Sequence, residues 1–301
     1  MVSCGAKHSL YQSFQQLLQS GDEVIVFSPY WFCYCDQVKL AHGVPVAVPV
    51  SEADAFQPDI AAVRRAITAK TKAIIVNSPC NPTGAVFDRA VLERLGKLAC
   101  ERGLFVIADE VYEKIVFDGA RHCSMAALDA DFAARTITIN SVSKTHSMTG
   151  WRIGYAAMPA ELAQKVTYLQ SMSTSGPCAI AQRAALAALT GDQAHVDAMV
   201  ADYRQRRDYL LGRISRIGSL SCFEPRGTFY LFVNVSGLFG RTLGGVEMLN
   251  AASVADAFAK GLAIQVTGGT AAFGSDRHVR ISFAASMKDL EEAMNRMEKH
   301  L

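Results

Sequence analysis

The segment from Ser141 to Tyr155 brings together side chains that could bind and activate a small molecule. It contains Lys144 and, eight residues later, Arg152, with hydroxyl side chains on both sides of the lysine. An amine can form a covalent bond with an aldehyde, and a guanidinium with neighbouring hydroxyls can bind a phosphate. Lysine usually lies on solvated surfaces, so a single Ser-x-Ser-Lys sequence is better explained as a solvated loop. The interpretation of this segment as a binding site therefore needs evidence from other parts of the chain.

Two further segments supply polar side chains of the same kind. Residues 77–84 contain two prolines and a glycine around Asn81, which predicts a rigid turn after an apolar strand. Asp109 ends another apolar run and Tyr112 follows it, so a partly buried carboxylate there would need a hydrogen-bonding or cationic partner. Each residue taken alone has an ordinary explanation, in which Asn81 caps its own turn and Asp109 caps the next element.

The elements that would position these groups alternate between apolar strands and amphipathic helices. Continuous apolar strands separated by helices predict an α/β fold, with a mostly parallel sheet covered by helices on both faces. In such sheets ligands bind beyond the carboxyl ends of the strands, which is where all three polar segments fall. The expected strands are Glu23–Phe27, Val44–Val48, Ala73–Val76, Leu104–Ala108 and Arg135–Asn140, and the expected helices include one around Leu10–Leu18, one near Ile60–Ile67 and one containing Val91 to Leu98.

The pattern changes beyond Pro177, where helices dominate and a long one is expected from about Asp192 to Ile217. After it, strand and helix signals mix, which predicts a smaller α+β domain. We therefore expect a large domain over residues 1–207 and a small C-terminal domain over 208–301. The strands expected there are Thr228–Val233, Ala263–Val266 and Val279–Phe283, and the helices are Val254–Lys260 and Lys288–His300.

Composition limits the class of partner. The 301 residues include 30 basic and 28 acidic side chains, a balance that argues against nucleic acid or a charged membrane surface. No apolar run approaches the roughly 20 residues that span a bilayer. The eight cysteines are scattered without metal-ligand spacing, so we expect reduced thiols, no metal site and a cytoplasmic location.

Considered together, Asn81, Asp109, Tyr112, Lys144 and Arg152 resemble the motif set of fold-type I pyridoxal-phosphate enzymes, specifically the aspartate aminotransferase family. The resemblance extends from Gly5 to the end of the chain. It implies that Lys144 forms a Schiff base with pyridoxal 5'-phosphate and carries a proton during catalysis. It also implies that Asp109 pairs with the pyridine nitrogen, so that the ring accepts electrons. Asn81 and Tyr112 would then hydrogen-bond the ring oxygen and tune the basicity of the imine nitrogen.

The same resemblance assigns a phosphate site. Ser141 and Arg152 would bind the phosphate, together with Gly5 and Ala6 at the start of the first helix, where free N–H groups favour an anion. Lys7, the next residue, is expected only to lie near this site.

The resemblance also assigns the substrate site. Trp31 would stack on the cofactor ring and, with Asn81, face the substrate, although core packing is the ordinary explanation of a single tryptophan. Arg280 would bind the substrate's α-carboxylate with a two-pronged hydrogen bond, for which a buried structural salt bridge is the alternative.

These assignments predict an aminotransferase that moves an amino group between an amino acid, aspartate by resemblance, and a 2-oxo acid, 2-oxoglutarate by resemblance. Two alternatives stay open: a C–S lyase or other eliminating enzyme with the same cofactor, and an inactive homologue that lacks the N-terminal segment of the family. The family has a segment upstream of the position of Gly5, and this chain begins close to that glycine. A homodimer is implied by the family alone.

Overall fold

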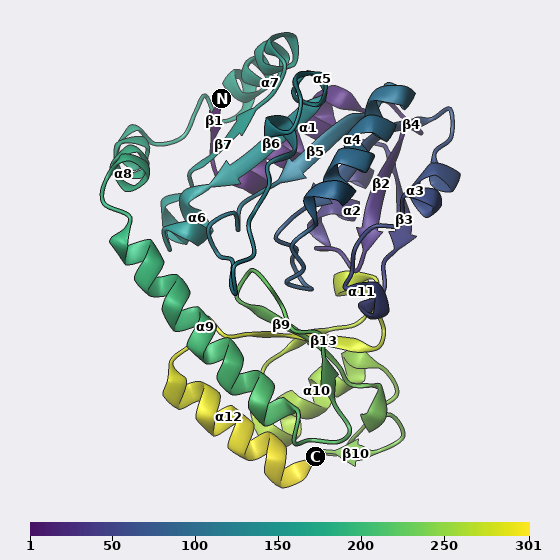
Figure 1. The fold of residues 1–301 in the computed structure, drawn as a ribbon, viewed down its shortest axis with the longest axis vertical. Coiled ribbons are helices and arrows are strands. Elements are labelled where there is room, and N and C mark those ends of the chain that lie inside the picture. The colour runs from purple at the N-terminus through teal and green to yellow at the C-terminus, as the bar shows by residue number, and fades with distance from the viewer.

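Apolar strands separated by amphipathic helices form a seven-stranded sheet covered on both faces. The computed structural model describes residues 1–301, and Figure 1 shows this sheet in the upper part of the molecule. The strand order is β1-β7-β6-β5-β4-β2-β3, in which β6, β5, β4, β2 and β3 are parallel, β7 pairs antiparallel with β6, and the edge strand β1 pairs antiparallel with β7. The mostly parallel sheet confirms the predicted fold class. The strands are β1 Val2–Ser3, β2 Glu23–Ser28, β3 Val44–Pro49, β4 Thr71–Asn77, β5 Phe105–Asp109, β6 Thr136–Ser141 and β7 Gly154–Ala157.

Side chains of the central strands alternate between the two faces, as the pleat of a strand requires. Val24 and Val26 of β2 pack with helices α1, α2 and α7, whereas Ile25 and Phe27 pack with α3, α4 and α5. Both faces are therefore buried, which explains why the strands are apolar throughout. The helices are α1 Ala6–Leu17, α2 Cys33–Leu40, α3 Ile60–Ala66, α4 Arg89–Arg102, α5 Ala130–Ala133 and α7 Ala160–Ser173.

A second, antiparallel sheet lies below the first in Figure 1 and has the strand order β12-β13-β9-β8. Its apolar core includes residues of α9, α10 and α12, and α9 runs from beside α8 along this sheet. The elements of this part are α8 Ala179–Thr190, α9 Ala194–Ile214, β8 Ser221–Cys222, β9 Tyr230–Asn234, β10 Thr242–Leu243, β11 Val246–Glu247, α10 Ala251–Leu262, β12 Thr267–Gly268, α11 Thr270–Phe273, β13 His278–Ser282 and α12 Met287–His300.

The predicted elements agree with the structure except at a few positions. The strand predicted over Ala263–Val266 is wrong, because Ala263 ends α10 with a left-handed backbone and the residues after it have no strand pairing until Thr267. The segment around Lys144, for which a solvated loop is the ordinary explanation, forms a short helix, α6 Val142–Thr145. The antiparallel strand β7 was not predicted. The domain division between residues 207 and 208 falls inside α9 and stays a prediction.

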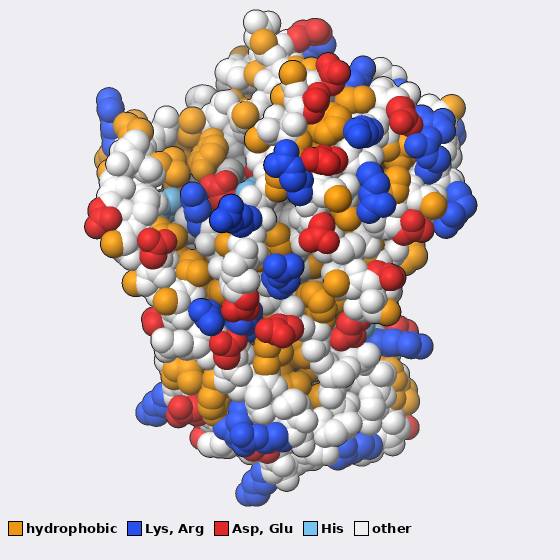
Figure 2. All heavy atoms as spheres, viewed as in Figure 1, with side chains coloured by type: hydrophobic (Ala, Val, Ile, Leu, Met, Phe, Trp, Pro, Cys, Tyr) orange, Lys and Arg blue, Asp and Glu red, His pale blue; other side chains and the backbone are white.

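The surface carries charges of both signs. Figure 2 shows basic and acidic side chains interspersed over the upper and lower parts of this face, with apolar atoms between them. No helix is both long and apolar enough to cross a membrane.

Candidate active site

The carboxyl ends of three neighbouring strands bring the predicted polar residues together. Asn77 ends β4 beside Asp109, its register partner at the end of β5, and β6 ends at Ser141 immediately before α6. A pocket of about 300 Å³ lies at this edge. Nine of the ten residues predicted for the site line it: Ala6, Trp31, Asn81, Asp109, Tyr112, Ser141, Lys144, Arg152 and Arg280.

Asp109 is the only carboxylate that lines the pocket, and it is buried. The Tyr34 hydroxyl donates a hydrogen bond of 2.7 Å to its Oδ2, and the Val111 N–H approaches its Oδ1 at 3.4 Å. Burial raises the pKa of Asp109 to about 6, although the Tyr34 hydrogen bond acts in the opposite direction. No cationic side chain lies within ion-pair distance of this carboxylate. Asp109 therefore presents an acceptor that a protonated ligand nitrogen would stabilise.

Lys144 lies one turn into α6, which begins where Ser141 accepts a hydrogen bond from the Ser143 N–H. Its Nζ lies 5.9 Å from the centre of the Tyr112 ring and 5.6 Å from that of Phe229, and it has no carboxylate partner. The amine thus lies against two aromatic rings, whereas a lysine on a solvated loop would extend into solvent.

Gly5 and Arg152 meet at another end of the pocket. Arg152 has a left-handed backbone, with φ of 56°, and its guanidinium donates to the Thr149 carbonyl at 2.7 Å. A Cβ on Gly5 would lie 2.4 Å from Nη2 of Arg152, so only glycine fits there. Gly5 does not line the pocket itself but lies against the guanidinium of Arg152, which does.

The N-terminus of α1 lies against the end of β7. A Cβ on Gly154 would come within 2.3 Å of Gly5 C and of Ala6 N, so the absence of a side chain lets α1 begin beside the sheet. The first N–H groups of a helix have no partners within it, and Ala6 lines the pocket. Ser141 is already engaged, because its hydroxyl donates to the Ile153 carbonyl at 2.8 Å and contacts the Ser143 hydroxyl at 2.7 Å.

Arg280 extends from β13 of the second sheet to the pocket. Its Nη1 donates a hydrogen bond of 2.7 Å to Oδ1 of Asn81, and its guanidinium lies 4.2 Å from the centre of the Tyr230 ring. The alternative of a structural salt bridge is wrong for this structure, because no carboxylate lies within 4.0 Å of Arg280. Stacking and one amide hold the guanidinium while leaving its charge uncompensated.

Trp31 lines the pocket with its ring edge-on to Tyr34, at 5.4 Å between ring centres. Lys7 Nζ lies 5.0 Å from the centre of the Trp31 ring. Lys7 also lines the pocket and has no carboxylate partner, which goes beyond the prediction that it lies only nearby.

Sequence reasoning missed several lining residues. Tyr34, which holds Asp109, is one; Tyr230, whose hydroxyl lies 3.4 Å from that of Tyr112, is another. Asn77 donates to the Asp109 carbonyl at 3.0 Å and accepts from the Asn81 N–H at 2.8 Å, so it ties two site loops together. Tyr34 and Tyr230 come from apolar stretches in which a tyrosine reads as core, and only the fold reveals their hydroxyl partners.

One group of metal-ligating side chains lies outside the pocket, formed by Glu110, Glu113 and His122. Glu110 accepts hydrogen bonds from the Ser124 hydroxyl and the Met125 N–H, and it contacts His122 at 3.1 Å. Its carboxylate oxygens are therefore used in packing the loop that follows β5.

A lysine and several unpaired cations at the carboxyl edge of a helix-covered parallel sheet form a site that suits an anionic small molecule. The family model of the class I and II aminotransferases matches residues 1–297. An aspartate aminotransferase of Geobacillus stearothermophilus is 42% identical over 301 residues, which is 100% of this chain and 75% of that protein. A probable aspartate/prephenate aminotransferase of Rickettsia conorii is 40% identical, over 99% of this chain and 75% of that one.

Solved structures agree with these relatives. The aspartate aminotransferase of Thermus thermophilus with maleate superposes with a TM-score of 0.90 at 40% identity, covering 100% of this chain and 75% of that one. The enzyme of Rhizobium meliloti gives a TM-score of 0.94 at 34% identity, covering 99% and 74%. The chain belongs to the class I and II aminotransferase family, and it is an aminotransferase that spans about three quarters of the length of these relatives.

The buried carboxyl of Asp109 yields a prediction for the protein without cofactor. Because its pKa is raised from 3.8 to about 6, the protonated form is favoured on folding; this contribution is complete below pH 4 and is lost as the pH rises through about 6. Asp109→Asn keeps an acceptor for Tyr34 and removes the buried charge. We expect the cofactor-free variant to be more stable than the parent at pH 8 by up to about 3 kcal/mol, and equally stable at pH 4.

Urea unfolding of both proteins at the two pH values measures this difference. The matched control is Asp88→Asn, because Asp88 is exposed at the start of α4. A parent protein that is more stable than Asp109→Asn at pH 8 would contradict the assignment of Asp109 as a costly, unpaired buried carboxylate.

Proposed function

We propose that the pocket binds pyridoxal 5'-phosphate and that the protein transfers an amino group between aspartate and 2-oxoglutarate. The observation that carries the proposal is the charge of the lining, in which four cationic side chains surround one carboxylate. The cations, none of which has a carboxylate within 4.0 Å, are Lys7, Lys144, Arg152 and Arg280. Unpaired cations at one site are costly unless an anionic ligand compensates them.

The residues fit the cofactor in charge and position. A dianionic phosphate matches Arg152 and the free N–H groups at the start of α1, to which Gly5 and Gly154 give room. Ser141 would add its hydroxyl. At the opposite end of the ring, a protonated pyridine nitrogen would pair with Asp109, whose pKa is raised by burial.

The remaining assignments follow the same placement. Asn81 and Tyr112 would donate hydrogen bonds to the ring oxygen, and Trp31 would cover one face of the ring. The cofactor supplies an electron sink that makes the α-proton of a bound amino acid removable. Lys144, which holds the cofactor through its amine, would afterwards take this proton and return it to the cofactor's carbon.

Arg280 would bind the α-carboxylate of the substrate. Its guanidinium is fixed by the Tyr230 ring and by Asn81, so little side-chain entropy is lost when a carboxylate binds. With Lys144 at the reacting carbon, this arrangement selects a substrate that carries an amine and a carboxylate on one carbon.

Lys7 would bind a second carboxylate. The phosphate, the cofactor aldehyde and the α-carboxylate account for Arg152, Lys144 and Arg280, so Lys7 is the cation that is left over. It is held over Trp31 at 5.0 Å. A substrate with a carboxylate on its side chain would compensate it, and the Thermus neighbour was solved with maleate, a dicarboxylate. Relatives named aspartate aminotransferase support aspartate as the donor.

We further propose a homodimer and a cytoplasmic location. Large apolar side chains are exposed along α7 and α8 and beside Arg152, which is costly unless another protein surface covers them. These side chains are Trp151, Tyr168, Met172, Ile180, Leu186 and Leu189.

The proposed reaction predicts a spectral half-reaction. Protein loaded with pyridoxal 5'-phosphate should lose its visible absorbance when aspartate is added and regain it with 2-oxoglutarate, because the amino group moves onto the cofactor and off again. Lys144→Ala should lower turnover by at least about a thousandfold, since both the covalent anchor and the proton carrier are removed. Stopped-flow absorbance measures both steps. Release of ammonia and pyruvate from cysteine without an oxo acid would instead favour a lyase, and absence of cofactor binding would favour an inactive homologue.

Substrate choice tests Lys7. Lys7→Gln should raise the KM for aspartate by roughly 10 to 100-fold, the effect of one lost charged hydrogen bond, and should leave the KM for alanine nearly unchanged. Lys39→Gln is the matched control, because Lys39 lies at the exposed end of α2. Steady-state kinetics with both donors give the ratio, and an equal change for aspartate and alanine would rule out the assignment.

The homodimer predicts a sedimenting species of twice the chain mass, and Ile180→Glu should convert it to the single chain, because Ile180 is the most exposed of the apolar side chains on α8. Leu249→Glu serves as the control for added charge, because Leu249 is also an exposed apolar side chain but precedes α10, away from α7 and α8. A single-chain species in the unaltered protein would contradict the proposal.

A further inference from the structure

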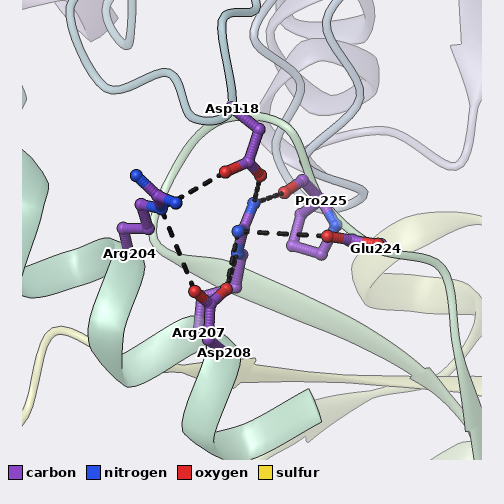
Figure 3. A network of polar contacts seen from close by, with 6 residues as sticks. All are labelled: Asp118, Arg204, Arg207, Asp208, Glu224 and Pro225. Atoms are coloured by element: carbon purple, nitrogen blue, oxygen red, sulfur yellow. Dashed lines mark hydrogen bonds and ion pairs between the residues drawn. The ribbon is translucent and has the colours of Figure 1, made fainter.

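Arg207 is a buried arginine outside the pocket that joins three parts of the chain. It projects from α9, and its side chain is only 2% exposed. Figure 3 shows its guanidinium between Asp118, which follows β5, and the segment of Glu224 and Pro225 before β9. Nη1 donates to both Asp118 Oδ2 and the Pro225 carbonyl, at 3.0 Å for the carbonyl. Nε and Nη2 donate to Asp208 at 2.9 and 2.6 Å.

The acidic partner Asp118 is itself held tightly. Its backbone is left-handed, with φ of 54°, and its second oxygen lies 3.3 Å from Nε of Arg204. Arg207 also covers the Phe117 ring, at 4.9 Å from its centre. The ion pairs of Asp118, its left-handed backbone and the contact between Arg207 and the Phe117 ring thus hold residues 117 and 118 in place.

The two segments that Arg207 contacts pair with each other. The Phe117 N–H donates to the Arg226 carbonyl at 2.9 Å, and the Thr228 N–H donates to the Ile115 carbonyl at 2.9 Å. Val116 and Gly227 form an antiparallel bridge between these bonds. Residues 115–118 and 225–228 thus form a two-stranded ribbon. Arg207 contacts both strands at one end of this ribbon, through the Asp118 carboxylate on one strand and the Pro225 carbonyl on the other.

Tyr112 and Tyr230, which lie just beyond the other end of this ribbon, line the pocket. Tyr112 lies three residues before Ile115, whose N–H donates to the Tyr112 carbonyl at 2.8 Å, and Tyr230 lies two residues after Thr228. The two tyrosine hydroxyls lie 3.4 Å apart, and the Tyr230 ring supports Arg280. The Gly84 carbonyl accepts from the Arg226 and Gly227 N–H groups, so the loop of Asn81 joins the same ribbon.

We infer that Arg207 is a positioning residue for the reaction, which sets the place of the Tyr112 hydroxyl through the ribbon of residues 115–118 and 225–228. The inference rests on the proposed function in one respect, namely that Tyr112 donates to the ring oxygen of the cofactor. The ribbon itself is a property of the chain without cofactor.

The direction of the effect follows from charge. A hydroxyl that donates to the ring oxygen withdraws electron density from it, and a misplaced hydroxyl leaves more negative charge there. That charge stabilises the protonated form of the nitrogen that links the cofactor to the protein. Loss of the Arg207 contacts with Asp118 and Pro225 therefore shifts the pH midpoint of the cofactor's absorbance upward.

The experiment compares three single variants. Arg207→Gln removes the hydrogen bonds to Asp118 and Pro225. Asp118→Asn removes one charge from a partner near the surface, and this second variant tests the inference if Arg207→Gln folds poorly. Arg213→Gln is the matched control, because Arg213 is also a largely buried arginine on α9 but binds Glu298 and Asn295 of α12, away from the ribbon. All three variants are expected to lose stability, so stability alone does not separate a positioning role from a structural one.

Two readouts separate these roles. Amide hydrogen exchange of the cofactor-free protein at Phe117 and Thr228 should accelerate at least about tenfold in Arg207→Gln and less in Asp118→Asn, with no change in Arg213→Gln. In protein loaded with pyridoxal 5'-phosphate, the absorbance midpoint should rise by roughly one pH unit in Arg207→Gln and stay in place in Arg213→Gln.

A double-variant cycle closes the test, because a residue that acts through Tyr112 cannot act when the Tyr112 hydroxyl is absent. Adding Arg207→Gln to Tyr112→Phe should produce no further shift of the midpoint. An undiminished shift in that background, or an unshifted midpoint in Arg207→Gln and Asp118→Asn with faster exchange, would overturn the inference while leaving the proposed function standing. Absence of cofactor binding in the unaltered protein would instead count against the proposed function, and the exchange rates would still report on the ribbon.

Discussion

Four cationic side chains without carboxylate partners line a pocket that contains one buried carboxylate, and this imbalance is the constraint on which the site depends. Lys7, Arg280 and the segment that carries both Lys144 and Arg152 are far apart in the chain, and Asp109 lies among these cations with its pKa raised to about 6 by burial. A folded protein keeps such an arrangement only if something else holds the groups in place, because each uncompensated charge costs free energy. The aromatic rings under Lys144 and Arg280, and the hydroxyl of Tyr34 on Asp109, do this without neutralising the charges.

The architecture explains why groups so distant in the chain meet. Parallel strands place their carboxyl ends at one edge, so residues that follow β4, β5 and β6 are neighbours whatever their separation in sequence. The second sheet contributes Arg280 and Tyr230, and the ribbon gripped by Arg207 joins that sheet to the loop of Tyr112. The geometry of the pocket thus depends on contacts between the two sheets as well as on the edge of the first.

The fold class and the position of three polar segments could be predicted because strand ends can be recognised in the sequence, whereas the roles of the site residues were assigned from the resemblance to the aminotransferase family. Asp109 is recognisable because it ends an apolar run, and Lys144 because it follows another. No role could be predicted for Tyr34, Tyr230 or Arg207. A tyrosine in an apolar stretch is expected in the core and an arginine in a charged helix is expected on the surface, until their partners are known. The sequence predicts only that Lys7 lies near the site, since the side of α1 that faces the pocket depends on how α1 lies against β7. The strand expected over Ala263–Val266 failed because four residues at a helix end carry no periodic signal that separates a strand from a coil.

The central claim is that the imbalance of charge exists to hold one cofactor through one lysine. Borohydride reduction of the protein loaded with pyridoxal 5'-phosphate, followed by peptide mass spectrometry, tests this directly because reduction makes the link between lysine and cofactor permanent. The account predicts that the label lies on Lys144 and that Lys7, although it lines the same pocket, stays unlabelled. Label on Lys7 or on another lysine, or no label at all, would contradict it.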